Sequence, residues 1–402
     1  MQVPGRKRTV TRQLRLGVVA GESSGDMLGA RLLRALAARC DGLAVEGIGG
    51  RQMVDCGLQS FFPMERLSVM GFSEPLGRLP ELLRLRRRLA ACFLRRPPDL
   101  FLGIDSPAFN LPLARRLHRA GIPTAHMVSP AVWAWRPGRI HRIGKSVDLV
   151  LCLFPFEPPL YIAQGIRAQF VGHPLADETA ECPDQSGARA ALGLPGGACV
   201  LALLPGSRAS EVRQLAPTFL EVARRLVADR PQLRLVMPVA NDACRRALEP
   251  LLTEYAALPL TLLYNDARAA LTAADAALVA SGTATLESAL LQRPMVVAYR
   301  MRALSAFLVS WLLRTEYVAL PNILAGRQLV PELLQGAATP EGLLAAVEPL
   351  LDNPRTSAEM VAEFRAMRTS LAGDFAAESA DALVNLVLSK RGCADGSVRS
   401  QL

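Results

Sequence analysis

VVAGESSGDMLGARLL, residues 18–33, sets a short apolar run directly before a helical pattern. The run ends at Ala20 and is typical of a buried strand, whereas from Asp26 onward apolar residues recur at helical spacing. Strand-to-helix turns of this kind lie at the carboxyl edge of a parallel sheet, where open α/β folds bind their ligands. Taken alone, the commoner explanation is a helix start capped by Ser24 or Asp26, with Glu22 facing water.

Composition is consistent with two globular domains and an anionic partner. The chain has 402 residues, half of them hydrophobic, which is enough for two substantial cores. Lys and Arg number 46 against 36 Asp and Glu, a net charge of +10 that suits a phosphate, a nucleotide or an acidic lipid surface. Basic residues are not interleaved with aromatic ones, so no nucleic-acid partner is expected.

Cysteine usage and hydropathy predict a cytoplasmic protein. The eight cysteines form no C-x-x-C pair and have no His cluster beside them, which favours reduced thiols over disulfides or a metal site. No signal-peptide core follows the basic N-terminus. The most hydrophobic segment, 303–313, is shorter than the roughly 20 residues that span a bilayer. The sequence therefore predicts a protein that is soluble or lies on a membrane without crossing it.

Strand-like and helix-like stretches alternate twice along the chain, a pattern typical of doubly wound α/β domains with parallel strands. A polar stretch rich in Gly and Pro, 177–197, predicts a linker between the two alternations. We therefore expect two Rossmann-like domains that face each other across a cleft. Their predicted extents are 1–180 and 181–365, followed by a helix within 366–402 that returns toward the first domain and ends in a frayed tail.

Two later turns carry groups that suit a nucleotide diphosphate. In PGSR, residues 205–208, glycine lets the backbone approach a ligand, serine can cap the helix and arginine offers a planar fork for phosphate. In SGTATLE, residues 281–287, backbone amides open a helix and a glutamate one turn later can accept ribose hydroxyls. Capped turns without a ligand remain the alternative. The donor-site candidates are Gly206, Ser207, Arg208, Ser281, Gly282, Thr283, Ala284 and Glu287.

The chain lacks several nucleotide-binding motifs, which argues against some reaction classes. The chain has no P-loop signature and no G-x-G-x-x-G after its first strand, which disfavours ATPases and dinucleotide oxidoreductases. It also lacks D-x-D, the usual ligand pair for a metal-bridged diphosphate. Basic groups and helix dipoles would then stabilise the leaving group, with no metal or other cofactor.

Longer strings in the chain resemble the lipid-A-disaccharide synthases, inverting glycosyltransferases of the GT-B fold. VSPAVWAWRPGRI (128–140) and LCLFPFEP (151–158) are the most specific, and the likeness covers about residues 14 to 385. The resemblance implies transfer of 2,3-diacylglucosamine from its UDP donor to the 6-hydroxyl of 2,3-diacylglucosamine 1-phosphate. The products would be a β(1→6)-linked disaccharide 1-phosphate and UDP, in the lipopolysaccharide biosynthesis of Gram-negative bacteria.

The resemblance also implies roles for individual residues. Asp105 is the candidate general base, since displacement at the anomeric carbon needs a carboxylate beside the incoming hydroxyl. The family often has a second Asp three residues on, which is Ala108 here, so the base is expected to be Asp105 or Glu22. His126 and His173 are expected to be structural. The remaining assignments are Ser24, Gly25 and Asp26 on the acceptor side, Asn322 as catalytic, Glu332 near the donor, and the donor-site candidates above as the UDP site.

Two neighbouring segments suggest contact with lipid. An apolar segment, 60–72, precedes an amphipathic helix near 79–94 with a basic face, a pairing that suits an anionic membrane. A surface helix packed on its own sheet explains the basic face as well. Segment 303–313 is a second candidate. The expected lipid contacts are Phe61, Phe62, Met64, Val69, Met70, Phe72, Arg84, Arg87 and Arg88.

Two other functions fit the same residues less closely. A UDP-N-acetylglucosamine 2-epimerase, or the peptidoglycan glycosyltransferase that acts on a lipid-linked muramyl peptide, would keep the two-domain fold. A catalytically inactive binding module is favoured only by Ala108. The expected partners are the two lipid substrates and the anionic inner face of the inner membrane, where the protein would be peripheral. The oligomeric state stays open, a homodimer included.

Overall fold

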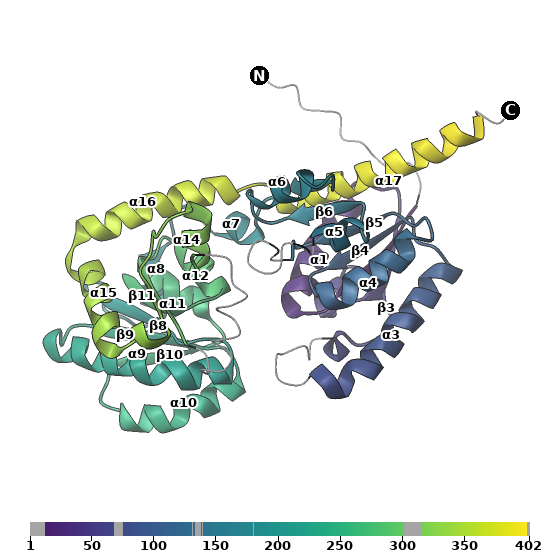
Figure 1. Cartoon of the computed structure of the whole chain (residues 1–402). Helices are drawn as coiled ribbons and strands as arrows, with labels where there is room; N and C mark the ends of the chain where they lie inside the picture. Colours follow the sequence, from purple (N-terminus) through teal and green to yellow (C-terminus); the bar gives the residue numbers. More distant parts are fainter. Residues whose placement is uncertain are drawn as a thin grey trace, which may run out of the picture. The chain divides into compact units, whose positions relative to one another are not determined.

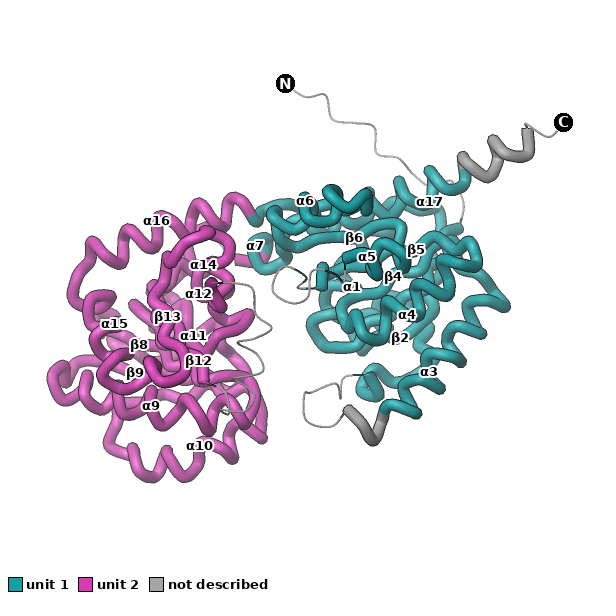
Figure 2. Tube along the Cα trace, in the orientation of Figure 1, with its two compact units in different colours: residues 1–177, 371–402 teal, residues 178–370 magenta. Residues whose placement is uncertain are grey.

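The chain forms two compact units, which the computed structural model describes individually (Figure 2). Unit 1 comprises residues 1–177 and 371–402, and unit 2 comprises residues 178–370. The sequence had suggested divisions after residues 180 and 365. The residues whose structure is described are 13–67, 75–130, 132, 138, 140–179, 181–300 and 316–399.

Unit 1 contains a seven-stranded parallel sheet in the order β3-β2-β1-β4-β5-β6-β7. Figure 1 labels β3, β4, β5 and β6 of this sheet. The central strand β4 is apolar throughout, and β1 is apolar except for Arg15, because helices cover both faces of a parallel sheet. The strands are β1 (Leu14–Ala20), β2 (Leu43–Ile48), β3 (Leu58–Ser60), β4 (Leu100–Ile104), β5 (Thr124–Met127), β6 (Leu149–Cys152) and β7 (Ala168–Phe170).

The helices of unit 1 include the C-terminal one. Leu383 and Leu386 of this last helix, α17, are buried in one cluster with Leu32 and Leu36 of α1. Helix α17 continues to Arg399, and the frayed tail stays a prediction. The helices are α1 (Ser23–Ala37), α2 (Arg51–Asp55), α3 (Pro75–Arg95), α4 (Pro107–His118), α5 (Ile140–Gly144), α6 (Glu157–Ile162), α7 (Pro174–Glu178) and α17 (Phe375–Arg399).

Unit 2 contains a six-stranded parallel sheet in the order β10-β9-β8-β11-β12-β13. Its strands are β8 (Val200–Leu204), β9 (Arg234–Val239), β10 (Leu260–Tyr264), β11 (Ala276–Ala280), β12 (Met295–Tyr299) and β13 (Glu332–Leu334). Its helices are α8 (Gln185–Ala191), α9 (Ala209–Asp229), α10 (Asp242–Glu254), α11 (Ala267–Ala273), α12 (Thr283–Leu290), α14 (Leu320–Ala325), α15 (Pro340–Asp352) and α16 (Pro354–Leu371).

The two doubly wound parallel sheets confirm the predicted fold class. The predicted linker 177–197 is not all loop, because it contains α8, whose N-cap Asp184 accepts a hydrogen bond from the Gly187 amide at 2.9 Å. The strands β3 and β13 were missed. Each is three residues long, too short for alternation to be recognised. Among the described residues, no helix is both long enough and apolar enough to span a bilayer.

Each sheet has a switch point, where successive connections turn to opposite sides. In unit 1 it lies between β1 and β4, where Ala20 is in register with Ile104. In unit 2 it lies between β8 and β11, where Leu204 is in register with Val279. Ligands of open α/β sheets bind at the carboxyl ends of the strands beside such a point. The candidate turns after residues 20, 104, 204 and 280 are therefore the four loops at the two switch points.

Two buried histidines make stability depend on pH. His126 is fully buried and His173 is 7% exposed, and burial lowers the pKa of each ring to about 4. The unfolded chain binds these protons near pH 6.5, so the free energy of unfolding is expected to fall as pH drops from about 6.5 to 4, by about 3 kcal/mol per ring. Urea titrations across this range should show a weaker pH dependence for His126→Leu. His141→Leu, which removes an exposed ring, is the matched control. Equal curves for wild type and His126→Leu would contradict the assignment.

Candidate functional site

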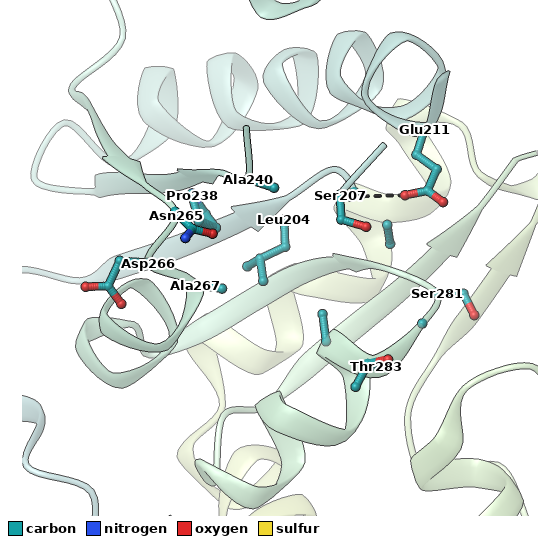
Figure 3. A pocket seen from close by; sticks show the side chains of 14 residues that line it. Leu204, Ser207, Glu211, Pro238, Ala240, Asn265, Asp266, Ala267, Ser281 and Thr283 are labelled. Atoms are coloured by element: carbon teal, nitrogen blue, oxygen red, sulfur yellow. Dashed lines mark hydrogen bonds between the residues drawn. The ribbon is translucent and has the colours of Figure 1, made fainter. Parts of the chain in front are cut away.

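A cavity of about 260 Å³ lies at the carboxyl edge of the sheet in unit 2 (Figure 3). Its lining residues lie at or just after the carboxyl ends of β8, β9, β10 and β11. The switch point of unit 2, between β8 and β11, is therefore part of this edge. Six of the eight donor-site candidates line it, and Arg208 and Glu287 are not among the described residues that do. The lining residues are Leu204, Gly206, Ser207, Glu211, Pro238, Ala240, Asn265, Asp266, Ala267, Ala280, Ser281, Gly282, Thr283 and Ala284.

A glutamate organises the loop after β8. The Glu211 carboxylate accepts hydrogen bonds from the backbone amides of Ser207 at 3.0 Å and Arg208 at 3.2 Å. Helix α9 therefore starts after Arg208, and the prediction that Ser207 caps it was wrong. Gly206 has φ of 129°, and a Cβ at this position would lie 2.5 Å from Cβ of Glu211. Only glycine lets the loop pass this close to the helix.

The loop after β11 presents the start of a helix to the cavity. Helix α12 begins at Thr283 with Gly282 as its N-cap, at φ of 152°. The Ser281 hydroxyl donates to the Val318 carbonyl at 3.3 Å, which orients the turn. The first amides of a helix have no partner within the helix, and the helix dipole favours an anion beside them. This turn suits one phosphate of a nucleotide diphosphate.

The two donor-site candidates that do not line the cavity have ionic partners of their own. The Arg208 side chain is 76% exposed, and its Nη1 donates to Oε1 of Glu211 at 3.0 Å. Glu287 lies one turn into α12, and its Oε1 accepts from Nε of Arg268 at 3.5 Å. Burial raises the pKa of the Glu287 carboxyl, and the charge of Arg268 opposes that rise. Arg268 also donates to Glu178 at 2.9 Å, so it holds Glu287 in place.

Asn322 is buried in a local hydrogen-bond network with Glu332 and the segment before β13, and its catalytic role stays a prediction. Its Nδ2 donates to the Val330 carbonyl at 2.9 Å and to Glu332 at 2.7 Å. Its Oδ1 accepts from the amides of Leu329 and Val330 at 2.7 and 2.8 Å. Glu332 in turn accepts from the amide of Ala319 at 2.8 Å, at the start of α14. These side chains are saturated by their own chain.

The turn after β1 divides into exposed and structural residues. Glu22 and Ser24 are exposed, at the N-cap and in the first turn of α1. Gly25 is buried, and a Cβ there would be in ordinary van der Waals contact with Cβ of Ala20, at 3.4 Å. Asp26 is 4% exposed.

The Asp26 carboxylate belongs to the interior of unit 1. It accepts hydrogen bonds from the backbone amides of Gly50 at 2.8 Å, Gln52 at 3.0 Å and Met53 at 3.1 Å. These amides lie at the start of α2, where an acidic side chain stabilises the helix. Asp26 therefore ties α1 to α2, and its predicted place on the acceptor side is not supported.

Strained backbone gathers beside the turn after β1. Asp105 and Ser106, which follow β4, have φ of 51° and 43°, and Val128, which follows β5, has φ of 68°. Residues other than glycine rarely adopt this left-handed conformation, and in proteins such strain concentrates at functional sites. The Ser106 side chain lies against Gly21, where a Cβ would collide with it. Asp105 and the turn after β1 are thus neighbours at the switch point of unit 1.

The candidate lipid contacts have mixed surroundings. Phe61 is 37% exposed and its ring lies 6.0 Å from that of Phe93, whereas Met64 is buried in the core of unit 1. The guanidinium of Arg66 covers the Phe62 ring at 5.9 Å. Helix α3 buries its apolar side, as the alternative predicted. Its exposed arginines include Arg84, Arg87 and Arg88, while Val69, Met70, Phe72 and the segment 303–313 lie outside the described residues.

Several cavity residues were missed in the sequence. Asn265 follows β10 in the left-handed conformation, with φ of 53°, and Asp266 caps α11 by accepting from the Ala269 amide at 2.9 Å. The string YNDA, residues 264–267, could have indicated this turn, because Asn and Asp after a strand favour it. Glu211 had a weaker one, as an acid in the first turn of a helix.

Comparisons with known proteins identify the family of this chain. Residues 16–384 match the family model for lipid-A-disaccharide synthetase. The Lipid-A-disaccharide synthase of Pseudomonas aeruginosa is 50% identical over 374 residues, covering 93% of this chain and 98% of that protein.

Two solved structures share the fold. The co-structure of Staphylococcus aureus MnaA with UDP superposes with a TM-score of 0.61 at 14% identity, covering 91% of this chain and 94% of that one. The kitacinnamycin glycosyltransferase gives 0.62 at 18% identity, covering 93% and 99%. The fold is GT-B, and the chain belongs to the lipid-A-disaccharide synthase family of glycosyltransferases.

Proposed function

We propose that this protein transfers 2,3-diacylglucosamine from its UDP donor to the 6-hydroxyl of 2,3-diacylglucosamine 1-phosphate. The carrying observation is near full-length similarity to a Lipid-A-disaccharide synthase, in a chain whose candidate loops lie at the switch points of two parallel sheets. A carboxylate removes the hydroxyl proton while the oxygen attacks the anomeric carbon. The bond from that carbon to the diphosphate breaks, its configuration inverts, and UDP leaves.

Unit 2 holds UDP in this proposal. The cavity beside β8 and β11 combines the start of α12 with Gly206, which lets the loop after β8 pass close to α9. Arg208, exposed at the edge of the same loop, can turn to the diphosphate and neutralise the charge of the leaving group. Glu287 accepts ribose hydroxyls with Arg268 holding its carboxylate.

Unit 1 supplies the base and the acceptor-side groups. Asp105 is our choice for the base because it lies in strained backbone at the switch point, beside the turn that bears Glu22 and Ser24. A carboxylate at this position acts by general base catalysis on the 6-hydroxyl. Asp26 and Asn322 have no part in the proposal, since their polar atoms are bonded within the fold.

The deciding experiment incubates the purified protein in EDTA with UDP-2,3-diacylglucosamine and radiolabelled 2,3-diacylglucosamine 1-phosphate. Chromatography of the lipids should show a labelled disaccharide phosphate, formed without divalent metal. If no disaccharide forms, even with Mg²⁺ restored and several acyl lengths tried, the proposed reaction is wrong. Release of a 2-epimerised sugar from UDP-N-acetylglucosamine would instead assign the chain to epimerase chemistry.

We further propose that the protein collects its lipid substrates at the anionic inner face of the inner membrane, through the exposed arginines of α3. Each arginine near such a surface contributes about 1 kcal/mol, so Arg84, Arg87 and Arg88 replaced together by Gln should weaken binding about 100-fold. Co-sedimentation with vesicles containing phosphatidylglycerol measures this. A matched triple change of Arg115, Arg116 and Arg119 in and just after α4 alters the charge equally. Equal losses for the two triple variants would mean that the attraction is not specific to α3.

A further inference from the structure

A buried asparagine links the switch point of unit 1 to the candidate base. Asn110, in the first turn of α4, is fully buried. Its Nδ2 lies 2.7 Å from the carbonyl oxygen of Asp105 and 3.2 Å from the carbonyl oxygens of Val19 and Ile104. One amide group therefore contacts the carboxyl ends of β1 and β4 and the loop that follows β4.

The identity of this side chain is constrained by its surroundings. Two N–H groups on one nitrogen are needed to reach three converging carbonyls, and a carboxylate in the same place would repel all three. The fit also depends on Gly103, because a Cβ there would lie 2.8 Å from Cβ of Asn110. The shortest of the three contacts is to Asp105 itself.

The hydrogen bond from Asn110 falls at two consecutive residues, Asp105 and Ser106, whose backbone is strained. A non-glycine residue in the left-handed region persists only when surrounding contacts impose it, and here two such residues follow each other. Both the backbone amide and the backbone carbonyl of Asp105 are hydrogen-bonded. Its amide donates to the Met127 carbonyl at 3.0 Å, and its carbonyl accepts from Asn110.

We propose that Asn110 is a positioning residue for the transfer reaction. It holds the backbone of Asp105 in the left-handed conformation and thereby keeps the Asp105 carboxylate where it takes the proton of the acceptor hydroxyl. The inference rests on the proposed function, in which Asp105 is the base. Asn110 itself contacts neither substrate.

A double-mutant cycle tests this inference in the full-length protein. Asn110→Ala should lower kcat by 10- to 100-fold and leave the Kd for UDP, bound by unit 2, unchanged. In the background of Asp105→Ala the same change should lower kcat less than twofold, because the group that it positions is already gone. Losses that multiply in the double variant would overturn the proposal.

Two further variants separate positioning from stability. Thr124→Val removes a fully buried hydroxyl at the amino end of β5, which donates to the Ser146 carbonyl at 3.2 Å. It should lower the melting temperature without changing kcat, so an equal loss of kcat would count against a specific role for Asn110. Asn110→Asp keeps the shape of the side chain if the alanine variant does not fold.

The aspartate variant adds a pH signature. Its kcat relative to that of the wild type should rise as pH is lowered, because only the protonated carboxyl can donate to the Asp105 carbonyl. A ratio independent of pH would contradict the proposal. If the wild type forms no disaccharide, the proposed function fails and this inference with it. If the wild type is active and the losses in kcat multiply in the double variant, only this inference fails.

Discussion

Replacing Asp105 with Asn is expected to lower kcat by about 10²- to 10⁴-fold, the range that general base catalysis contributes. The amide keeps the size and the backbone preference of the residue but has no basic lone pair for the proton of the acceptor hydroxyl. Because Asp105 lies in unit 1, the Kd for UDP should stay within a factor of two of the wild type. Single-turnover kinetics and calorimetric titration with UDP measure the two quantities.

Glu22→Gln is the matched variant, since Glu22 is the other carboxylate considered for the base. It is exposed at the N-cap of α1, in the turn that adjoins Ser106. A drop in kcat of about tenfold or less is expected if it only orients the acceptor. Should Glu22→Gln abolish turnover while Asp105→Asn retains it, the base is Glu22.

Gly206→Ala is expected to raise the Kd for UDP by about 10- to 100-fold, equivalent to 1–3 kcal/mol. The new methyl group would lie 2.5 Å from Cβ and 2.7 Å from Oε2 of Glu211, and the residue would have to keep φ of 129°. Either the loop shifts or Glu211 releases the amides of Ser207 and Arg208. In both cases the wall of the cavity changes, and kcat at saturating donor should change less than Kd.

Gly193→Ala provides the control for backbone strain. Gly193 also lies in unit 2 with positive φ, at 66°, but a Cβ there meets nothing within 4 Å. This variant should lose stability with little effect on UDP affinity. Wild-type affinity in Gly206→Ala would show that the ligand does not depend on the loop after β8.

Local patterns in the sequence determined the parts of this protein that depend on neighbouring residues along the chain. Apolar runs followed by helical periodicity predicted both parallel sheets, and β1 ends at Ala20, as predicted. Chain order then placed the turns after β1, β4, β8 and β11 at carboxyl strand ends, because parallel strands with crossover helices leave those ends on one edge. Six of the eight donor-site candidates line the cavity for this reason.

Only the tertiary structure decided which polar side chains are available to a ligand. The sequence predicted Asp26 and Asn322 as site residues. In the structure Asp26 accepts from the amides of Gly50, Gln52 and Met53, at least 24 residues away, and Asn322 accepts from those of Leu329 and Val330. Asn110 is the converse case, since its nearest carbonyl is five residues away and another is 91 residues away. Hydrogen bonds in a folded chain are satisfied by whatever groups packing brings together, and sequence spacing does not record that proximity.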